Sequence, residues 1–407
     1  MTFQTLYRAA VVLPVTAPPI RDGYVTVRDG VVTGVGPIEE RPSGPGITET
    51  DLGSVLLMPG FVNAHTHLEL SHLAGAVPGE RGFVPWIEDQ LRVRAERPPE
   101  EVPEGINRAI AALEAGGTAA VADVTNSLAA LKPLAASRLH ALVLHEILGF
   151  DPARAEAVME QTTAARSAAV ADVEALAPNS AIRVEVAAHA PHSISRELFA
   201  LLIKSGGIRS IHVAESKSED EFVKHGGGEW REFLDRRVGP VPFNAPATGP
   251  VRYLDELGVL TKGLLAVHCV RVVDDDARLL AARGAVAVLC PRSNEFLGNG
   301  VPPLAMLLGS GIALALGTDS LASCASLDVL EDARVLSRRF PRVPKSILLH
   351  ALTRGGALAL GFERLGEITK GAAARFATLS FDGPAPADPA AFILHEAVSA
   401  RGLFCDR

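Results

Sequence analysis

The sequence lacks most features that mark secreted, membrane-spanning and nucleic-acid-binding proteins. Its four cysteines are widely spaced and form no Cys-x-x-Cys pair, which argues against a disulfide framework and against structural zinc. No stretch of 18 apolar residues is present, so no membrane span is expected. A net charge of −8 without a long Lys/Arg block argues against a nucleic-acid-binding surface or a polybasic membrane anchor.

The N-terminus also lacks the pattern of an exported protein. Residues 1–8 contain no basic segment that leads into a long apolar run and a small-residue cleavage site. Four widely spaced cysteines without a Cys-x-x-Cys pair are typical of the reduced thiols of a cytoplasmic protein. We therefore expect a cytoplasmic protein whose partner is a small-molecule substrate. A homodimer is compatible with the sequence, which does not determine the oligomeric state.

Apolar residues, in contrast, are abundant. With 48% hydrophobic residues in a chain of 407, the protein can bury a large core. That length suits either one α/β barrel of about 250 residues with additions or two ordinary domains. Apolar strand-sized runs alternate with helical segments over residues 56–360, which predicts βα units and a parallel sheet. The strand candidates are 56–64, 118–124, 139–147, 182–189, 209–214, 264–269, 285–290 and 312–318.

Eight βα units that close on themselves form a (β/α)8 TIM barrel, the α/β fold that we predict for residues 56–360. The flanks, 1–55 and 361–407, have the pattern of short strands and turns, with Asp29-Gly30 as a hairpin signal. We expect the two flanks to pack together as a small β-sandwich domain. An open doubly wound sheet is disfavoured, because no Gly-x-Gly-x-x-Gly follows the first strand of the barrel pattern.

The most informative motif is His65-Thr66-His67, which directly follows the apolar stretch 55–62. In a strand, residues i and i+2 point to the same face, so His65 and His67 can present two imidazoles to one ion. Imidazole suits zinc, iron(II) and similar metals. A His-x-His pair also occurs by chance, so a catalytic site requires further ligands and a proton shuttle.

Three other apolar runs end in residues of the right chemistry. His212 and Glu215 follow one run, His268 ends the second, and Asp319 ends the third. In a TIM barrel, catalytic residues cluster at the C-terminal ends of the strands, so these side chains are expected to converge. The four potential metal ligands are then His65, His67, His212 and Asp319.

Each of these residues has a plainer interpretation when it is taken alone. A single His212 or His268 in an apolar strand is often a hydrogen-bonded core histidine. Asp319 could cap a helix, and Glu215 could be a solvated carboxylate that faces Lys217. The occurrence of all of them at predicted strand ends favours a catalytic site.

Six segments together resemble the successive barrel motifs of the amidohydrolase superfamily. The resemblance is to its cytosine deaminase-like branch, which includes guanine, S-adenosylhomocysteine and aminodeoxyfutalosine deaminases and the triazine hydrolases. It spans the barrel and both flanks, with the motifs in the order of the family. The segments are 59–67, 189–192, 212–215, 268–269, 290–294 and 317–320.

The resemblance implies a single divalent metal, zinc before iron, with a bound water. Three neutral imidazoles and one carboxylate leave the ion positive, which lowers the pKa of that water and makes hydroxide available for attack on an aminated ring carbon. Glu215 would move a proton to the ring nitrogen, while His268 and Asp319 would orient the water and relay a proton to ammonia. Binuclear members carry a bridging lysine at the end of the fourth strand, and residues 183–189 contain none. The implied ligands are His65, His67, His212 and Asp319.

Five further residues are candidates for contact with the substrate. His189 takes a position that touches the substrate in related deaminases, or it packs beside the site. Glu69 could hold polar groups and Trp86 could stack on a base, although Trp86 could also anchor an amphipathic helix. Glu146 and Asn294 could contact the substrate or support neighbouring site residues.

The predicted function is that of a mononuclear metal-dependent aminohydrolase, a hydrolase that acts on carbon–nitrogen bonds other than peptide bonds. It would deaminate an aminated N-heterocycle that resembles a purine nucleoside, with aminodeoxyfutalosine as the nearest substrate. One alternative is a hydrolase of cyclic amides or carbon–halogen bonds. Another is a non-catalytic barrel that binds a metal or ligand, but no implied ligand or proton-transfer residue is missing. The long segment 219–251 is either a substrate lid or a structural excursion.

Overall fold

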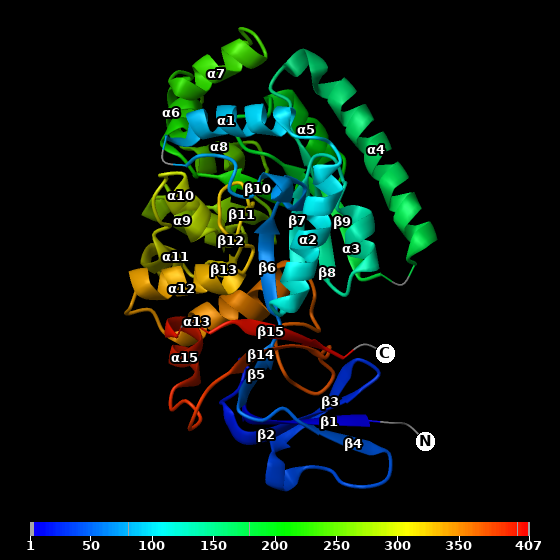
Figure 1. Ribbon diagram of the computed structural model, residues 1–407. Helices are drawn as coiled ribbons and strands as arrows, with labels where there is room; N and C mark the ends of the chain where they lie inside the picture. The colour runs from blue at the N-terminus through cyan, green and yellow to red at the C-terminus, as the bar shows by residue number, and fades with distance from the viewer. Residues whose placement is uncertain (1–3, 80, 179, 397, 406–407) are drawn as a thin grey trace.

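The structure is a computed structural model that describes residues 4–79, 81–178, 180–396 and 398–405. Its larger sheet has eight parallel strands in sequence order, from β6 to β13, with helices around it (Figure 1). This arrangement confirms the predicted TIM barrel. The strands are β6 (Phe61–Thr66), β7 (Thr118–Thr125), β8 (His140–Ile147), β9 (Ile182–Ala188), β10 (Ser210–Val213), β11 (Leu265–His268), β12 (Val286–Leu289) and β13 (Ala313–Leu316).

The first and last barrel strands meet at the level of the predicted metal ligands. Thr66 and Asp319 form a parallel bridge. The backbone oxygen of His65 accepts hydrogen bonds from the nitrogens of Thr318 and Asp319, at 3.0 and 3.1 Å. A Cβ at Gly317 would lie 2.7 Å from the Cβ of His65, so glycine permits this approach. The chain segments that carry the ligands are thus joined by backbone hydrogen bonds.

The flanks form a second, mostly antiparallel sheet of seven strands. Its order is β15-β14-β5-β1-β2-β3, and β4 also pairs with β1, so the sheet forks at β1. Both ends of the chain therefore lie in one sheet, and the small β-domain predicted from them is confirmed. The strands are β1 (Gln4–Val12), β2 (Ile20–Arg28), β3 (Val31–Pro37), β4 (Ile47–Asp51), β5 (Val55–Pro59), β14 (Arg375–Ser380) and β15 (Ala400–Phe404).

The hairpin signal at Asp29-Gly30 is confirmed. Both residues have positive φ, 50° and 71°, and they join β2 to β3 as a type I′ turn requires.

The single strand predicted over 56–64 is wrong. Residues Val55–Pro59 form β5 in the flank sheet, whereas β6 begins the barrel at Phe61. Between them, a Cβ at Gly60 would lie 2.7 Å from the Cβ of Ala119, so glycine lets the chain pass from one sheet to the other. The domain limits at residues 55 and 361 stay a prediction.

Helices cover the barrel, and α1, α6 and α7 lie at the end farthest from the flank sheet (Figure 1). Among the described residues, no helix is both long and apolar enough to cross a membrane. The α-helices are α1 (Phe83–Glu96), α2 (Glu101–Ala115), α3 (Leu131–Ala136), α4 (Ala155–Leu176), α5 (Arg196–Lys204), α6 (Lys217–His225), α7 (Glu229–Arg237), α8 (Pro250–Glu256), α9 (Asp274–Ala282), α10 (Pro291–Phe296), α11 (Leu304–Ser310), α12 (Val329–Arg339), α13 (Lys345–His350), α14 (Gly356–Ala359) and α15 (Pro389–His395).

Candidate active site

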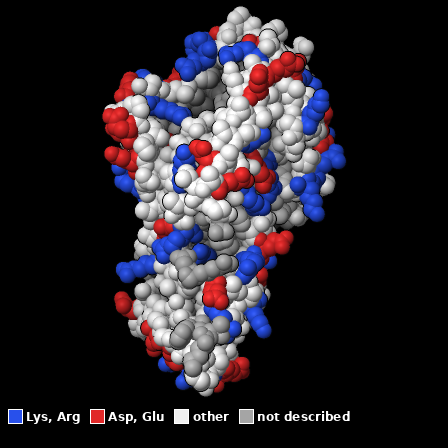
Figure 2. Space-filling view, turned by 90° about the vertical axis from the view of Figure 1, so that its right-hand side faces the viewer, with Lys and Arg blue, Asp and Glu red and all other residues white. Residues whose placement is uncertain are grey.

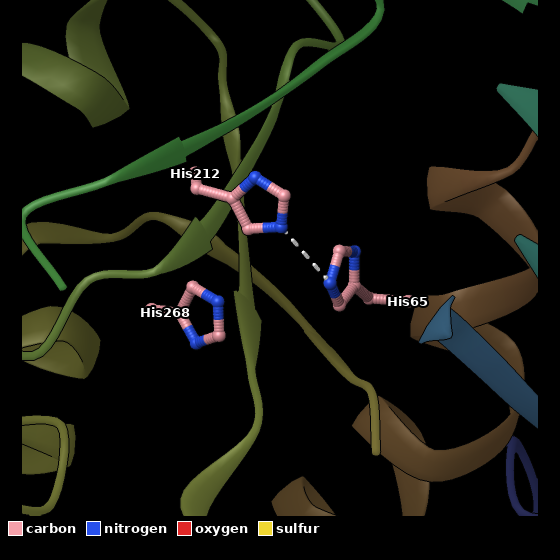
Figure 3. A group of neighbouring side chains, drawn as sticks. All are labelled: His65, His212 and His268. Carbon is pink, nitrogen blue, oxygen red and sulfur yellow. Dashed lines mark hydrogen bonds between the residues drawn. The ribbon is translucent and has the colours of Figure 1, made fainter. Parts of the chain in front are cut away.

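The predicted metal ligands come together at the C-terminal ends of the barrel strands. His65 lies in β6 and His212 in β10, and their rings meet edge-on beside His268 from β11 (Figure 3). The Nε2 atoms of His65 and His212 are 3.3 Å apart. On the other side of His65, Nε2 of His67 lies 3.7 Å from Oδ1 of Asp319. Four imidazoles and one carboxylate therefore surround one small space.

The hydrogen-bond partner of His212 fixes where the lone pair of this ring points. Nδ1 of His212 lies 2.7 Å from the backbone oxygen of His189, so it donates its proton there and leaves Nε2 unprotonated. Burial and then the neighbouring imidazoles lower the pKa of His212 to about 3 and that of His65 well below its usual value. Neutral imidazoles with inward lone pairs are the form that binds a metal ion.

The donor set fits one divalent ion. Ligand atoms of His65, His67 and Asp319 all lie within 4.8 Å of one another, and so do those of His65, His212 and His268. The Nε2 atoms of His65 and His212 are 3.3 Å apart, and His212 has no proton on Nε2 to donate. This arrangement is the one expected of two ligands that bind the same ion. An imidazole-rich set with a single carboxylate suits zinc or iron(II) better than magnesium or calcium.

Three of the strand ends carry non-glycine residues with left-handed backbone. Ala214, His268 and Asp319 have φ values of 52°, 74° and 64°. Such conformations cost about 1–3 kcal/mol each and cluster at functional sites. The next helix after Asp319 is α12, which Asp328 caps, so Asp319 is not a helix N-cap. Its carboxylate instead accepts hydrogen bonds from Ser293 Oγ (2.6 Å) and the Ser320 nitrogen (2.7 Å).

Glu215 lies in the turn between β10 and α6 and is buried, so it is not a solvated loop carboxylate. Its Oε1 lies 3.7 Å from Nε2 of His268 and accepts a hydrogen bond from Nδ2 of Asn299 at 3.3 Å. Burial, and after it the negative charges of Asp319 and Glu219, raise the pKa of the Glu215 carboxyl well above its usual value. Glu215 can therefore carry a proton at a pH where ordinary carboxylates have lost theirs.

Glu219, which the sequence analysis missed, holds this turn in place. Its two carboxylate oxygens accept hydrogen bonds from the backbone nitrogens of Ala214 (2.9 Å) and Glu215 (2.7 Å). Ser216 caps α6 by accepting from the Glu219 nitrogen. The pattern Ser-x-x-Glu resembles a capping box, and this signal in the sequence could have identified Glu219.

We expect the E219Q variant to lower kcat by about 10–100-fold, the usual cost of removing a partner that orients a site residue. The amide nitrogen cannot accept from a backbone N–H, so the turn that aims Glu215 loses one of its two hydrogen bonds. Steady-state kinetics should show little change in KM, because Glu219 does not line the cavity. The matched control is E221Q, an exposed carboxylate on the same helix. Equal kcat for E219Q and the unmodified protein would contradict this role.

Asn294 lies behind His268. Its Oδ1 accepts from Nδ1 of His268 at 2.8 Å, which leaves Nε2 of that ring unprotonated and directed at Glu215. Burial lowers the pKa of His268 to about 3. Asn294 is not among the residues that line the cavity. Its hydrogen bond fits the second of its two interpretations, support of a neighbouring site residue, and its contact with substrate stays a prediction.

A cavity of about 430 Å³ opens above this cluster. Its inner end is lined by His67, His212, Glu215, His268 and Asp319. A pocket of this size, mostly apolar with a few converging polar groups, is typical of a site for a small molecule.

Glu146 and His189, at the ends of β8 and β9, also line the cavity. Oε2 of Glu146 accepts from Nδ2 of Asn126 at 3.0 Å, whereas the buried Oε1 has no hydrogen-bond partner among the described residues. Burial raises the pKa of Glu146 to about 7, although His67 and Asn126 act against it. His189 is held by Ser193, whose Oγ lies 2.7 Å from Nδ1. Both side chains offer polar atoms to a bound molecule.

Glu69 and Trp86 line the cavity as well, but each is also part of the scaffold. Glu69 accepts hydrogen bonds from Thr125, from the Asn126 nitrogen, and from the nitrogen and Oγ of Ser127, so it fixes the turn after β7. Trp86 packs in an apolar cluster with α7, and its buried Nε1 has no acceptor among the described residues. The two interpretations of Trp86, as helix anchor and as wall of the site, are compatible.

The long segment 219–251 forms one wall of the cavity. It contains most of α6, all of α7 and a loop that leads to α8, and α7 contributes Trp230, Phe233, Leu234 and Arg237 to the lining. Arg236 of α7 and Glu88 of α1 join the two helices through a 2.6 Å ion pair. The segment therefore covers the site; its movement as a lid stays a prediction.

The model of the Amidohydrolase family matches residues 56–404 of this chain. The chain belongs to the amidohydrolase family. Over 372 residues it is 32% identical to an aminodeoxyfutalosine deaminase of Deinococcus radiodurans, covering 85% of this chain and 84% of the relative. It is 29% identical over 397 residues to a 5-methylthioadenosine/S-adenosylhomocysteine deaminase of Pelotomaculum thermopropionicum. This match covers 93% of this chain and 85% of the relative.

Solved structures of deaminases share the fold along the whole chain. An aminofutalosine deaminase of Helicobacter pylori, in complex with methylthio-coformycin, superposes with a TM-score of 0.82 at 23% identity and covers 98% of both chains. An adenosine deaminase from Xanthomonas campestris with bound zinc gives a TM-score of 0.76 at 25% identity, covering 97% of this chain and 90% of that one. The histidine and aspartate cluster of this amidohydrolase is accordingly a site for a divalent metal.

Proposed function

We propose that this amidohydrolase is a mononuclear deaminase that releases ammonia from the aminated ring of an adenine nucleoside derivative, with aminodeoxyfutalosine as the leading candidate. The observation that carries the proposal is the pairing of Glu215, a buried carboxyl with a raised pKa, with His268 at the inner end of the cavity. Proton donor and proton acceptor lie together beside the metal ligands. The names of the curated relatives support deamination of an adenine-type ring.

Four residues would hold the ion, namely His65, His67, His212 and Asp319. A divalent metal supplies Lewis-acid chemistry there, lowering the pKa of water so that a nucleophile is available at neutral pH. We propose zinc, supported by the donor set and by the zinc-bound relative from Xanthomonas campestris. A single ion is proposed because β9 runs from Ile182 to Ala188 without a lysine that could bridge two.

The proposed proton transfers follow from the hydrogen bonds that His268, Glu215 and Asp319 make in the structure. Nε2 of His268 is an acceptor, because Nδ1 donates to Asn294, so it can take a proton from the attacking water. Glu215 gives its proton to the ring nitrogen beside the attacked carbon. The carboxylate of Asp319, fixed by Ser293 and Ser320, orients the water. The proton taken from water then passes from His268 to the amino group, which leaves as ammonia. The hydroxyl group on the ring carbon returns its proton to Glu215 as the carbonyl forms.

Four side chains of the cavity wall would hold the nucleoside. Trp86 offers a flat apolar surface for stacking, and Glu69 offers a carboxylate in the same cavity lining. The unpartnered Oε1 of Glu146 and the ring of His189 offer hydrogen bonds close to the metal cluster. These contacts would place the aminated carbon between the metal ligands and Glu215.

We expect the E146Q variant to raise KM by about tenfold, the loss of roughly one hydrogen bond to a charged or strongly polar partner. The substitution keeps the shape of the side chain but changes what Oε1 and Oε2 can donate and accept. Steady-state kinetics on the best substrate would measure it, with E185Q on the neighbouring strand β9 as control, since Glu185 does not line the cavity. An unchanged KM would show that Glu146 does not contribute to substrate binding.

A panel of substrates tests the proposed function. The metal-analysed protein is incubated with aminated purines, nucleosides, pterins, pyrimidines and triazines, and with cyclic amides and halogenated triazines. We expect ammonia from adenine nucleosides and neither amide opening nor halide release. Halide release or amide hydrolysis without ammonia would contradict the proposal. It would support the alternative from the sequence, a hydrolase of cyclic amides or carbon–halogen bonds.

A cytoplasmic location and a homodimer complete the proposal. The location is supported by Cys269, Cys290 and Cys324, which are buried thiols without disulfides. Light scattering of the purified protein would test the homodimer.

A further inference from the structure

An ion pair between Arg292 and Asp332 is buried behind the candidate active site. Figure 2 shows Lys, Arg, Asp and Glu side chains spread over one face of the molecule, where water solvates them. Asp332, on α12, is instead fully buried, and the Arg292 side chain is only 16% exposed. Because the removal of two charges from water is costly, a buried ion pair adds little to stability compared with apolar side chains. Stability alone therefore does not account for this pair.

The guanidinium of Arg292 joins three segments of the chain. Its Nε and Nη2 donate to Oδ2 of Asp332 at 2.9 and 2.7 Å, and its backbone nitrogen donates to Oδ1 at 3.2 Å. Nη1 donates to Oγ of Ser326 at 3.0 Å. Nη2 also lies 3.0 and 2.9 Å from the backbone oxygens of Ser326 and Asp328. These bonds tie the start of α10 to α12 and to the loop 320–328, which precedes α12.

The residue after Arg292 on α10 supports the metal ligand Asp319. Oγ of Ser293 donates to Oδ2 of Asp319 at 2.6 Å. Oγ of Ser323, in the loop, lies 2.8 Å from the same hydroxyl oxygen. The two hydroxyls and the carboxylate form one buried chain of hydrogen bonds. The orientation of Asp319 therefore depends on how closely α10 packs against the loop, and Arg292 fixes that packing.

The same end of α10 supports His268. Asn294 follows Ser293, and its Oδ1 accepts from Nδ1 of His268 at 2.8 Å. One short helix thus holds a metal ligand through one residue and the proposed proton acceptor through the next. A displacement of α10 would alter both.

We propose that Arg292 and Asp332 form a positioning pair that fixes α10 against the loop 320–328. The pair thereby holds the carboxylate of Asp319 and the ring of His268 in the geometry that the proposed reaction requires. This inference rests on the proposed function, which assigns these two residues their roles. Neither member of the pair lines the cavity, so the pair acts through other residues and not by contact with substrate. A guanidinium suits this role because its planar donors have fixed directions.

The R292K variant tests the pair. Lysine keeps the positive charge beside Asp332, but it cannot make the bidentate contact together with the bonds to the loop. We expect kcat to fall by about 10–100-fold and the zinc dissociation constant to rise by about 10–100-fold, the usual cost of removing a partner that orients a ligand. KM should change little. Steady-state kinetics with an adenine nucleoside and a competition titration with a chelator measure these quantities.

Cobalt(II) in place of zinc gives a readout that does not depend on turnover. Cobalt(II) absorbs visible light according to the geometry of its ligands, whereas zinc has a filled d shell and does not. We expect the R292K spectrum to differ from that of the unmodified protein in band position or intensity. A pair that only stabilises the fold would leave the spectrum of the folded variant unchanged.

A double-mutant cycle tests the route through Ser293. S293A removes the hydroxyl that holds Asp319 and leaves the ion pair intact. If Arg292 acts through this hydroxyl, the rise in zinc dissociation constant in the double variant should be smaller than the product of the two single effects. A rise equal to that product would overturn the route and with it the inference.

The matched control is R354K. Arg354 also pairs with a carboxylate, that of Glu367 at 3.2 Å, and it donates to the backbone oxygens of Glu363 and Leu365. It does not line the cavity. R354K should keep kcat, zinc affinity and the cobalt spectrum, whatever the change in its unfolding temperature.

The outcomes separate the inference from the proposed function. Unchanged kcat, zinc affinity and cobalt spectrum in folded R292K would overturn the inference, while ammonia release by the unmodified protein upheld the function. If the unmodified protein releases no ammonia, weaker zinc binding and an altered spectrum in R292K would uphold the positioning of Asp319 and reject deamination. No change in either would then reject both.

A second variant covers the case in which R292K does not fold. S326A deletes one hydrogen bond between Arg292 and the loop and keeps the ion pair. We expect it to raise the zinc dissociation constant by about threefold, within the range of one hydrogen bond. Zinc affinity and a cobalt spectrum equal to those of the unmodified protein would overturn the inference.

Discussion

Replacing Glu215 with glutamine is expected to lower kcat by about 10²–10⁴-fold, the range that a positioned acid–base group contributes. Glutamine keeps the size of the side chain and can still accept from Asn299, but it cannot deliver a proton to a ring nitrogen. Glu215 is not among the proposed ligands, so metal analysis of E215Q should give the same content as the unmodified protein.

Two controls make this result interpretable. E221Q, which alters an exposed carboxylate on α6, should retain full activity. Thermal unfolding should show that E215Q is folded, because the backbone nitrogen of residue 215 still donates to Glu219. If E215Q kept activity within a factor of a few, proton transfer would have to be assigned to another group.

Removal of the metal is expected to abolish activity and to destabilise the protein. An ion present at about 100–1,000 times its Kd stabilises the folded state by about 3–4 kcal/mol, so a chelator should lower the unfolding temperature. The H67N and D319N variants should bind less than one ion per chain and show no detectable ammonia release. Nε2 of His67 and Oδ1 of Asp319 are 3.7 Å apart. H67N removes an imidazole ligand, and D319N removes a negatively charged carboxylate ligand.

The H225N variant is the matched control for loss of a histidine. His225 is exposed at the end of α6 and does not line the cavity. Readdition of zinc to the chelated protein should restore both activity and unfolding temperature. Full activity in protein shown to be free of metal would contradict the assignment of the cluster.

The barrel and the positions of the candidate ligands could be predicted from the sequence for one physical reason. A strand that is buried on both faces contains a continuous apolar run, such as residues 119–122 in β7 and 141–144 in β8, and this run makes the strand visible in the sequence. The barrel fold then places the polar residues that follow such runs, such as His212, Glu215 and Asp319, at one end of the barrel.

The remaining features depend on contacts between distant segments. The stretch 56–64 looks like one strand in the sequence, and only the pairing of β5 with β14 and of β6 with β7 shows that the chain changes sheets at Gly60. Asn294 lies on α10, and only its hydrogen bond with Nδ1 of His268 shows that it faces that ring. No pattern in the sequence places Arg237 in the cavity lining, because that place depends on how α7 packs against α1.

The most direct test is deamination of an adenine nucleoside by metal-replete protein in water labelled with heavy oxygen. The account predicts one ammonia for each product molecule, one labelled oxygen on the ring carbon that lost the amino group, and loss of both in E215Q and in the chelated protein. Release of ammonia without the label, or labelled product from protein free of metal, would contradict a metal-dependent hydrolytic deaminase.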